Sequence, residues 1–374
     1  MRILAAAATG LAGLALCTLA WASPADEAFE KLAAAYLRDL PEFSPVAATA
    51  AGDHRYDHRL DQADAASRAR RIELYRDYLS ALEDIPSRNL SRANQVDAEL
   101  LRSELESNLW SLEVLEEWAW NPLVYVDIAG SSLYSLLARD FAPLEQRLED
   151  AAARLEQVPR FLAQVRGALE PLRVPQVHAQ TAVAQNQGIA SIIDTLIVPR
   201  LGELPPEPRK RLEAAIAMAR DALAEHQAWL QDELVPAAEG DFRLGARLFD
   251  QKLRYTLDSP LGRREIRRRA EREYADVREE MFRISKAIYR GLHPYATFPD
   301  DPEEAFKQVI IRAALQQAYE HLPARDGIVD VARQYLAQAT EFVQANDIVT
   351  LPGDPIEIIV MPEYQRGVAV AYLE

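Results

Sequence analysis

The stretch PLGRREIRRRAEREYADVREEMFRISKAIYR, residues 260–290, carries the clearest helical pattern in the chain. Its apolar positions recur every three or four residues, as one face of an α-helix requires. They are Ile266, Ala270, Tyr274, Val277, Met281, Ile284 and Ile288. Ser259 is a candidate N-cap, and Pro260 stands at the first helical position, where a missing N–H costs nothing. We predict a long helix over Pro260–Arg290 with one buried stripe, and the arginines at 263–269 as a solvated face.

The same spacing predicts further helices on both sides of this stretch. They cover Ala25–Leu40, Gln62–Asp84, Arg92–Trp118, Pro143–Leu169, Pro175–Leu201, Pro208–Leu234, Leu244–Leu257, Pro302–Leu322 and Asp326–Ala345. Each helix needs its neighbours to bury its apolar face. The predicted fold class is therefore mainly α, a multi-helix array, with a helical domain over residues 23–346.

The pattern changes after Asn346. Residues 355–362 and 367–372 are rich in β-branched residues and predict two short strands, a β segment at the C-terminal end. Strands this apolar must be paired and covered, but no helix follows them. We interpret residues 347–374 as the start of a truncated catalytic portion. The alternative is a natural C-terminal strand docked on a sheet edge.

The N-terminus predicts export. Met1-Arg2, an apolar run over Ile3–Leu19 and the A-x-A site ending at Ala22 follow the order of a secretory signal peptide. We predict a signal peptide over residues 1–22, with cleavage after Ala22, and a periplasmic or secreted protein. The run is short and rich in alanine and glycine, which disfavours a membrane anchor.

Composition narrows the possible partners. The formal net charge is −16, so the chain would be repelled by nucleic acid and by anionic membrane surfaces. We expect neither as a partner after signal cleavage. Cys17 is the single cysteine and lies inside the predicted signal peptide. The mature protein would therefore depend on its core, not on disulfides, for stability.

The histidines do not form a zinc-hydrolase motif. No H-E-x-x-H occurs. His54 and His58 have the i, i+4 spacing, but Gly52 and Asp53 predict a turn, so we interpret both as surface loop residues. His226 lies on an apolar stripe and is predicted to be a core histidine. His178 begins a helix rich in amides, which indicates either a polar seam between helices or the wall of a water-filled cleft. We assign no catalytic residue and no metal ligand.

Three segments carry a family resemblance. Residues 43–60 (FSPVAATAAGDHRYDHRL), residues 242–254 (FRLGARLFDQKLR) and residues 361–372 (MPEYQRGVAVAY) are similar to segments of a large family of exported bacterial proteins, the domain of unknown function 885 family. The resemblance implies a helical, zincin-like metallopeptidase relative. The zinc motif of that family would lie C-terminal to Arg366-Gly367, so zinc is expected only in such a further portion and no cofactor in this chain.

Two functional hypotheses follow. In the first, the chain is the non-catalytic N-terminal portion of an exported zincin-like metallopeptidase and forms one wall of a cleft for a peptide or small substrate. Tyr364 and Arg366 are then the candidate substrate contacts, because an edge strand often pairs with an extended peptide. A structural ion pair is the alternative role of Arg366. In the second hypothesis, the chain is a complete, non-enzymatic helical module of the cell envelope that binds a peptide or protein. The oligomeric state is left open.

Overall fold

The computed structural model describes residues 23–354 and 356–368. The N-terminal helices are α1 (Pro24–Asp39), α2 (Pro45–Ala50), α3 (Ala65–Glu83), α4 (Arg92–Trp110) and α5 (Glu117–Trp120). The central helices are α6 (Pro122–Leu137), α7 (Leu144–Leu155), α8 (Val158–Ala168), α9 (Gln176–Ile192), α10 (Pro206–Trp229) and α11 (Val235–Ala237). The last helices are α12 (Gly245–Leu257), α13 (Arg263–Leu292), α14 (Glu304–Tyr319) and α15 (Ile328–Asn346). The mainly helical class predicted from the sequence is confirmed.

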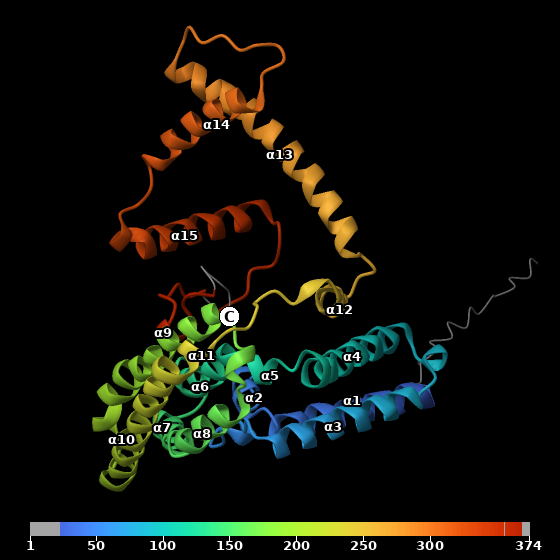
Figure 1. Ribbon diagram of the computed structural model, residues 1–374, viewed down its shortest axis with the longest axis vertical. Helices are drawn as coiled ribbons and strands as arrows, with labels where there is room; N and C mark the ends of the chain where they lie inside the picture. Colours follow the sequence, from blue (N-terminus) through green and yellow to red (C-terminus); the bar gives the residue numbers. More distant parts are fainter. Residues whose placement is uncertain (1–22, 355, 369–374) are drawn as a thin grey trace, which may run out of the picture.

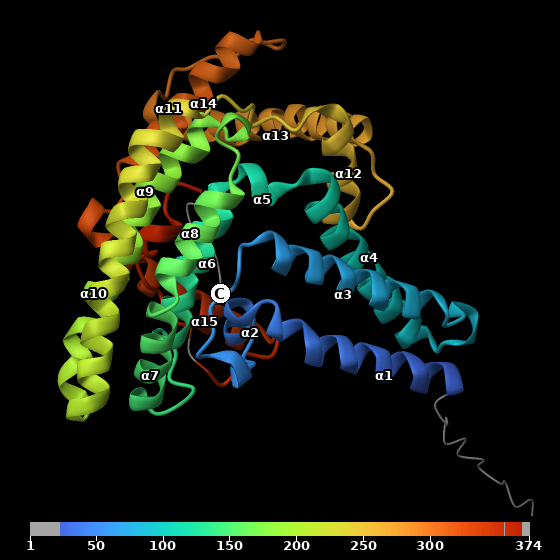
Figure 2. The ribbon, with the colours of Figure 1, turned by 60° about the horizontal axis from the view of Figure 1, so that its bottom comes forward.

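The central helices form the main core of the molecule, which we call the bundle (residues 122–238). Here α6 packs on α9, and α10 packs on α7, α8 and α9. The core includes Leu133, Leu148, Phe161 and Ile193, all with 0% exposure. In Figure 2 the helices α7 to α10 lie beside one another, while α1 and α3 extend away from them.

The helices α1, α3 and α4 pack on one another around two small cores, one containing Phe29 and Leu82 and the other Tyr36, Tyr75 and Leu105. Helix α1 has a complete capping box, because Ser23 and Asp26 each accept a hydrogen bond from the backbone amide of the other. Proline stands early in α1, α2, α6, α8 and α10. Their starts therefore follow from local chemistry.

The last four helices are much less buried, and we call them the arm (α12–α15). Helices α13 and α14 pair around Phe282, Ile310 and Ile311. Figure 1 shows α13 leading away from α12, with α14 and α15 leading back toward the bundle. Helix α13 begins at Arg263 with Gly262 as N-cap, three residues later than predicted. Ser259 instead accepts a hydrogen bond from the Leu261 amide.

The predicted buried stripe of α13 is wrong for most of its length. Tyr274 is 66% exposed and Ile284 is 50% exposed. The spacing correctly identified one apolar face, but in the described part of the chain Met281 alone among its last four members packs on the core shared with α14.

The predicted β segment is also not found. Residues 356–362 are irregular, and no strand occurs within 23–354 or 356–368. Ile356 and Val360 are exposed and no neighbouring backbone pairs with them, so their β-branched composition has no ladder to join. Residues 355 and 369–372 of the predicted strands lie outside the described residues, as does the predicted signal peptide at 1–22.

Helix α6 was not predicted, although it is central to the bundle. It is apolar on nearly every side because it is enclosed, so it lacks the one-sided pattern on which the prediction relied. Its start did carry a signal: the Asn121 side chain caps the helix and Pro122 follows at the first position. None of the helices in the described ranges combines the length and apolar character needed for a membrane span.

Candidate functional site

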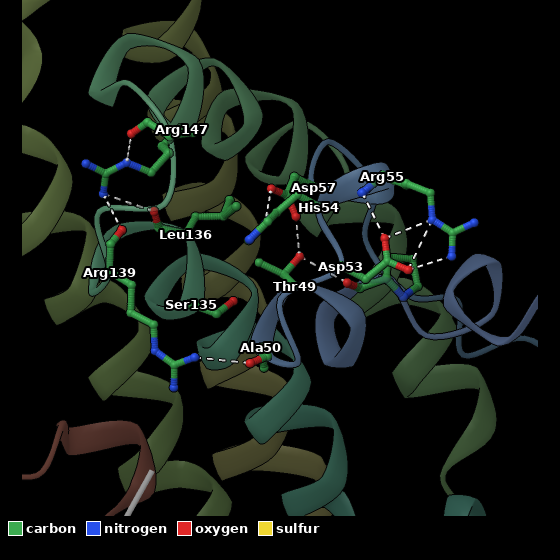
Figure 3. Close-up of polar contacts among 12 residues, drawn as sticks. Thr49, Ala50, Asp53, His54, Arg55, Asp57, Ser135, Leu136, Arg139 and Arg147 are labelled. Atoms are coloured by element: carbon green, nitrogen blue, oxygen red, sulfur yellow. Dashed lines mark hydrogen bonds and ion pairs between the residues drawn. The ribbon is translucent and has the colours of Figure 1, made fainter. Parts of the chain in front are cut away.

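The Gly-Asp-His-Arg-Tyr-Asp segment, residues 52–57, forms polar contacts with Thr49 of α2 and among its own side chains (Figure 3). The Asp57 carboxylate is buried, accepts a hydrogen bond of 2.6 Å from the Thr49 hydroxyl and lies 2.9 Å from His54 Nδ1. The His54 ring stacks on Phe141 with a centroid separation of 3.7 Å. His54 is thus a partly exposed loop residue, as predicted, but one held on two sides. His58 is exposed.

Arg154 links the residues on both sides of this segment to the bundle. Its side chain is fully buried and donates to the Thr49 hydroxyl at 2.6 Å and to the Ser132 carbonyl at 2.7 Å. It also donates to the carbonyl of Arg59 at 3.0 Å. Burial lowers the pKa of Arg154 to about 10, so the group stays charged at neutral pH. The contacts around Arg154 join the N-terminal loop to α6 and α7, and their role is structural.

A second arginine closes the turn after α6. Arg147 donates to the carbonyls of Ala142 and Arg139, at 2.9 and 2.8 Å. Arg139 in turn donates to the Ala50 carbonyl at 3.2 Å (Figure 3). These arginines were not singled out from the sequence, because nothing in their spacing separates a carbonyl-binding arginine from a solvated one.

Tyr364 is anchored in a slot between α6 and α9. It is 1% exposed, and its hydroxyl lies 3.2 Å from the Ser131 hydroxyl. Gly130 and Gly188 form the slot. A Cβ at Gly130 would lie 2.2 Å from the Tyr364 ring, and one at Gly188 would lie 2.4 Å from the Tyr364 amide nitrogen. A glycine inside a helix is a sequence signal for such close approach.

Arg366 lies beside the anchored tyrosine and is half exposed. Its backbone carbonyl accepts a hydrogen bond of 2.8 Å from the Gln185 side chain. Its guanidinium donates to the Met361 carbonyl and lies 3.3 Å from Glu363. The ion pair that was the alternative role of Arg366 is therefore present. A substrate contact of Tyr364 or Arg366 stays a prediction.

The amide-rich helix α9 forms a polar seam. Gln185 and Asn186 are buried, and Asn186 donates to the Gln227 side chain at 2.8 Å. The seam interpretation is thus supported for Asn186, whereas Gln185 donates to the Arg366 carbonyl of the C-terminal segment. His178 lies near Trp120, with ring centroids 5.9 Å apart. His226 is 3% exposed, so its predicted burial is confirmed, but its buried Nδ1 has no hydrogen-bond partner among the described residues, whereas a satisfied core histidine would have one.

The arm presents a large set of exposed apolar side chains, which we call the open arm residues. On α13 they share one face by their spacing, and on α15 they recur every seven residues. The set consists of Phe249, Tyr274, Val277, Ile284, Ile288, Ile328, Tyr335 and Phe342, each between 37% and 66% exposed. Helices α12 and α15 contain no buried residue at all. Exposed apolar faces of this kind are typical of interaction sites.

The comparisons with known proteins agree with this fold. No curated protein matches the sequence. A solved structure of a protein from Shewanella oneidensis, described as a candidate lipoprotein of unknown function, is similar with a TM-score of 0.70 and 25% identity. The match covers 87% of this chain and 59% of that chain, so this chain spans less than two thirds of its relative. Residues 45–374 match the family described as "Bacterial protein of unknown function (DUF885)", and the chain belongs to that family.

Proposed function

We propose that the chain is the non-catalytic helical portion of an exported, zincin-like metallopeptidase relative and forms one wall of a cleft for a peptide or small substrate. The open arm residues carry this proposal. Their helical spacing is that of faces selected for burial, yet they stay exposed in the described structure. Burying one such side chain contributes roughly 1.5–3 kcal/mol, so covering the arm would be strongly favourable.

The occupant we propose for the arm is a zinc-bearing catalytic portion of the same protein. The resemblance implies a zinc motif C-terminal to Arg366-Gly367, and the anchored Tyr364 would hold the start of that portion against α6 and α9. The matched Shewanella oneidensis chain contains polypeptide outside the matched part, which is compatible with such a cover. Arg366 would then stand near the junction, where its guanidinium suits a peptide carboxylate or carbonyl.

The described residues of this chain do not fit a zinc site. In the ranges 23–354 and 356–368 no group of three His, Cys, Asp or Glu side chains could hold a metal ion. We therefore derive no catalytic step from this chain, and the zinc would belong to the covering portion.

The test starts from the codons that follow Glu374. Where they continue in frame with an H-E-x-x-H motif, the longer protein is purified beside a variant with both motif histidines changed to alanine. We expect stoichiometric zinc by elemental analysis and chelator-sensitive cleavage of a mixed peptide library, both absent in the variant. An in-frame stop codon, or a longer protein without zinc and without cleavage, would refute the proposal.

A stop codon at that point would favour the second candidate, a helical binding module of the cell envelope. The open arm residues would then serve as the binding surface for a peptide or protein. In either case we propose a periplasmic or secreted location. N-terminal sequencing of the protein from fractionated cells should start at Ser23.

A further inference from the structure

A cavity of about 170 Å³ lies where the N-terminal helices meet the bundle. Its walls come from α3, the turn after α4, α5, α6 and α8. Aromatic rings and two arginines dominate its lining: Arg68, Arg71, Tyr75, Trp118, Tyr125 and Phe161. It is a candidate small-molecule site that the sequence analysis did not identify.

The two arginines are available for an anion. Arg68 donates to the Ala63 carbonyl at 3.0 Å, and its guanidinium lies 3.7 Å from the centre of the Trp118 ring. Arg71 donates to the Phe43 carbonyl. Neither arginine forms an ion pair with a carboxylate of the described residues. Both arginines are held in place by backbone carbonyls. The other N–H groups of each planar guanidinium can therefore donate to a carboxylate.

The same cavity also offers negative charge. Asp61 and Glu117 belong to its lining. Asp61 is buried and accepts a hydrogen bond of 3.1 Å from the Val46 amide, while Glu117 accepts one of 2.8 Å from the Asn121 side chain. The lining therefore combines two cations, two carboxylates and an apolar remainder. A ligand that complements this combination carries one positive group, one negative group and an apolar body.

One wall is built from irregular backbone. Helix α4 ends in a π-helical turn over Ser111–Leu115, and Glu116 follows in the left-handed region with φ 51° and ψ 44°. Ser111 and Leu112 on one side of Glu116, and Glu117 and Trp118 on the other, all line the cavity. Both π turns and left-handed non-glycine residues concentrate at functional sites. Here they bring Trp118 back over Arg68.

We infer that this cavity binds a small zwitterion with an apolar side chain, either a free amino acid or a dipeptide. The carboxylate lies against Arg68 and Arg71, the ammonium group against Asp61 or Glu117, and the side chain among Trp118 and its aromatic neighbours. This inference is independent of the proposed function, because it involves neither the arm nor a metal.

The test is a calorimetric titration of the purified chain with leucine and phenylalanine, and with analogues that lack one charge. We expect binding of the amino acids, and at least tenfold weaker binding of leucinamide and of N-acetyl-leucine. Leucine-containing dipeptides separate the two sources: tighter binding than leucine identifies a dipeptide, and weaker binding identifies a free amino acid. No binding of any of these compounds at millimolar concentration would overturn the inference.

Variants locate the site. Arg71→Gln should weaken leucine binding at least tenfold, whereas Arg70→Gln, on the same helix but outside this cavity, should leave it unchanged. Because Arg71 also bonds Phe43, circular dichroism must show that the variant is folded. Glu117→Gln supplies a second check that leaves Arg71 intact. This variant should reduce the difference in binding affinity between leucine and N-acetyl-leucine. Equal leucine binding by wild type, Arg71→Gln and Glu117→Gln would refute the assignment.

Discussion

The bundle and the arm have similar sequence patterns but different degrees of burial. In the bundle, the apolar faces of α7 and α10 pack on each other, and residues such as Leu148 and Leu212 are fully buried. In the arm, an equally regular pattern on α13 leaves Tyr274 and Ile284 largely exposed. An amphipathic pattern therefore shows that a face is suited to burial, and the tertiary partner decides whether it is buried.

The largest effect should come from the buried arginine of the bundle. Arg154→Ala removes the donors that satisfy the Thr49 hydroxyl and the Ser132 and Arg59 carbonyls, and it leaves Asp57 without the nearby positive charge. We expect a loss of about 3–5 kcal/mol in the free energy of unfolding, measured by urea denaturation.

The matched control for Arg154 is an arm arginine. Arg283 is 68% exposed at its side chain and pairs with Glu280 on the same helix. Arg283→Ala should cost less than about 1 kcal/mol, because exposed ion pairs contribute little. Equal losses in the two variants would mean that the arm is as tightly integrated as the bundle, and the contrast between the regions would fail.

A group of the bundle should also cause the loss of stability at mildly acidic pH. Burial lowers the pKa of His226 to about 4, against about 6.5 in an unfolded chain. Between these values the unfolded state binds a proton that the folded state excludes. Stability is therefore complete above about pH 6.5 and falls as the pH drops toward 4, by up to about 3 kcal/mol.

Urea denaturation at pH 7 and pH 5 measures this loss. His226→Leu should remove most of the difference between the two conditions. His321→Gln changes an exposed histidine just after α14 in the arm. This variant should keep the wild-type difference in stability between pH 7 and pH 5. If the His226 variant loses as much stability on acidification as the wild type does, another group is responsible.

The comparison also explains which parts of the structure could be predicted from sequence. Helices with one apolar face, such as α12 and α13, were found because their period is visible. The enclosed α6 was missed since burial on all sides removes the period. The anchoring of Tyr364 depends on Gly130 and Gly188, which belong to different helices, so no local pattern shows that they meet.

The candidate sites were harder to predict than the fold. His226 was recognised because a histidine on an apolar stripe has few other roles. The cavity of Arg68 and Arg71 draws its walls from five separate elements, and its irregular turn at Glu116 has no glycine to mark it. The apolar residues of 356–362 predicted a strand, but a strand also needs a partner, which sequence composition does not reveal.

A smaller and local effect is expected where the C-terminal segment meets the bundle. Gly188→Ala places a Cβ 2.4 Å from the Tyr364 amide nitrogen, so the segment 361–368 must move away or α9 must shift. Overpacking of this kind costs about 1–3 kcal/mol. We expect faster proteolytic cleavage within residues 350–368, detected by mass spectrometry, while the bundle stays folded.

Gly167→Ala is the control for this change. Gly167 is also helical, but a Cβ there meets nothing within 4 Å. Alanine should be neutral or stabilising by up to about 1 kcal/mol through helix propensity, with wild-type proteolysis of the C-terminal segment. Unchanged proteolysis in Gly188→Ala would show that the segment is not held by the slot.

The smallest effect on stability should come from the arm itself, and it is the most direct check of the contrast. Ile284 is 50% exposed, so Ile284→Ser removes little buried surface and should change the free energy of unfolding by no more than about 0.5 kcal/mol. The buried Leu133, changed to alanine, should cost about 2–5 kcal/mol. The arm substitution should instead reduce binding of a hydrophobic fluorescent dye, because the open arm residues provide the exposed apolar surface.

A loss of stability from Ile284→Ser as large as that from Leu133→Ala would show that α13 is covered in solution. The partner would then be a second copy of the chain, and the stability of the wild type would rise with protein concentration.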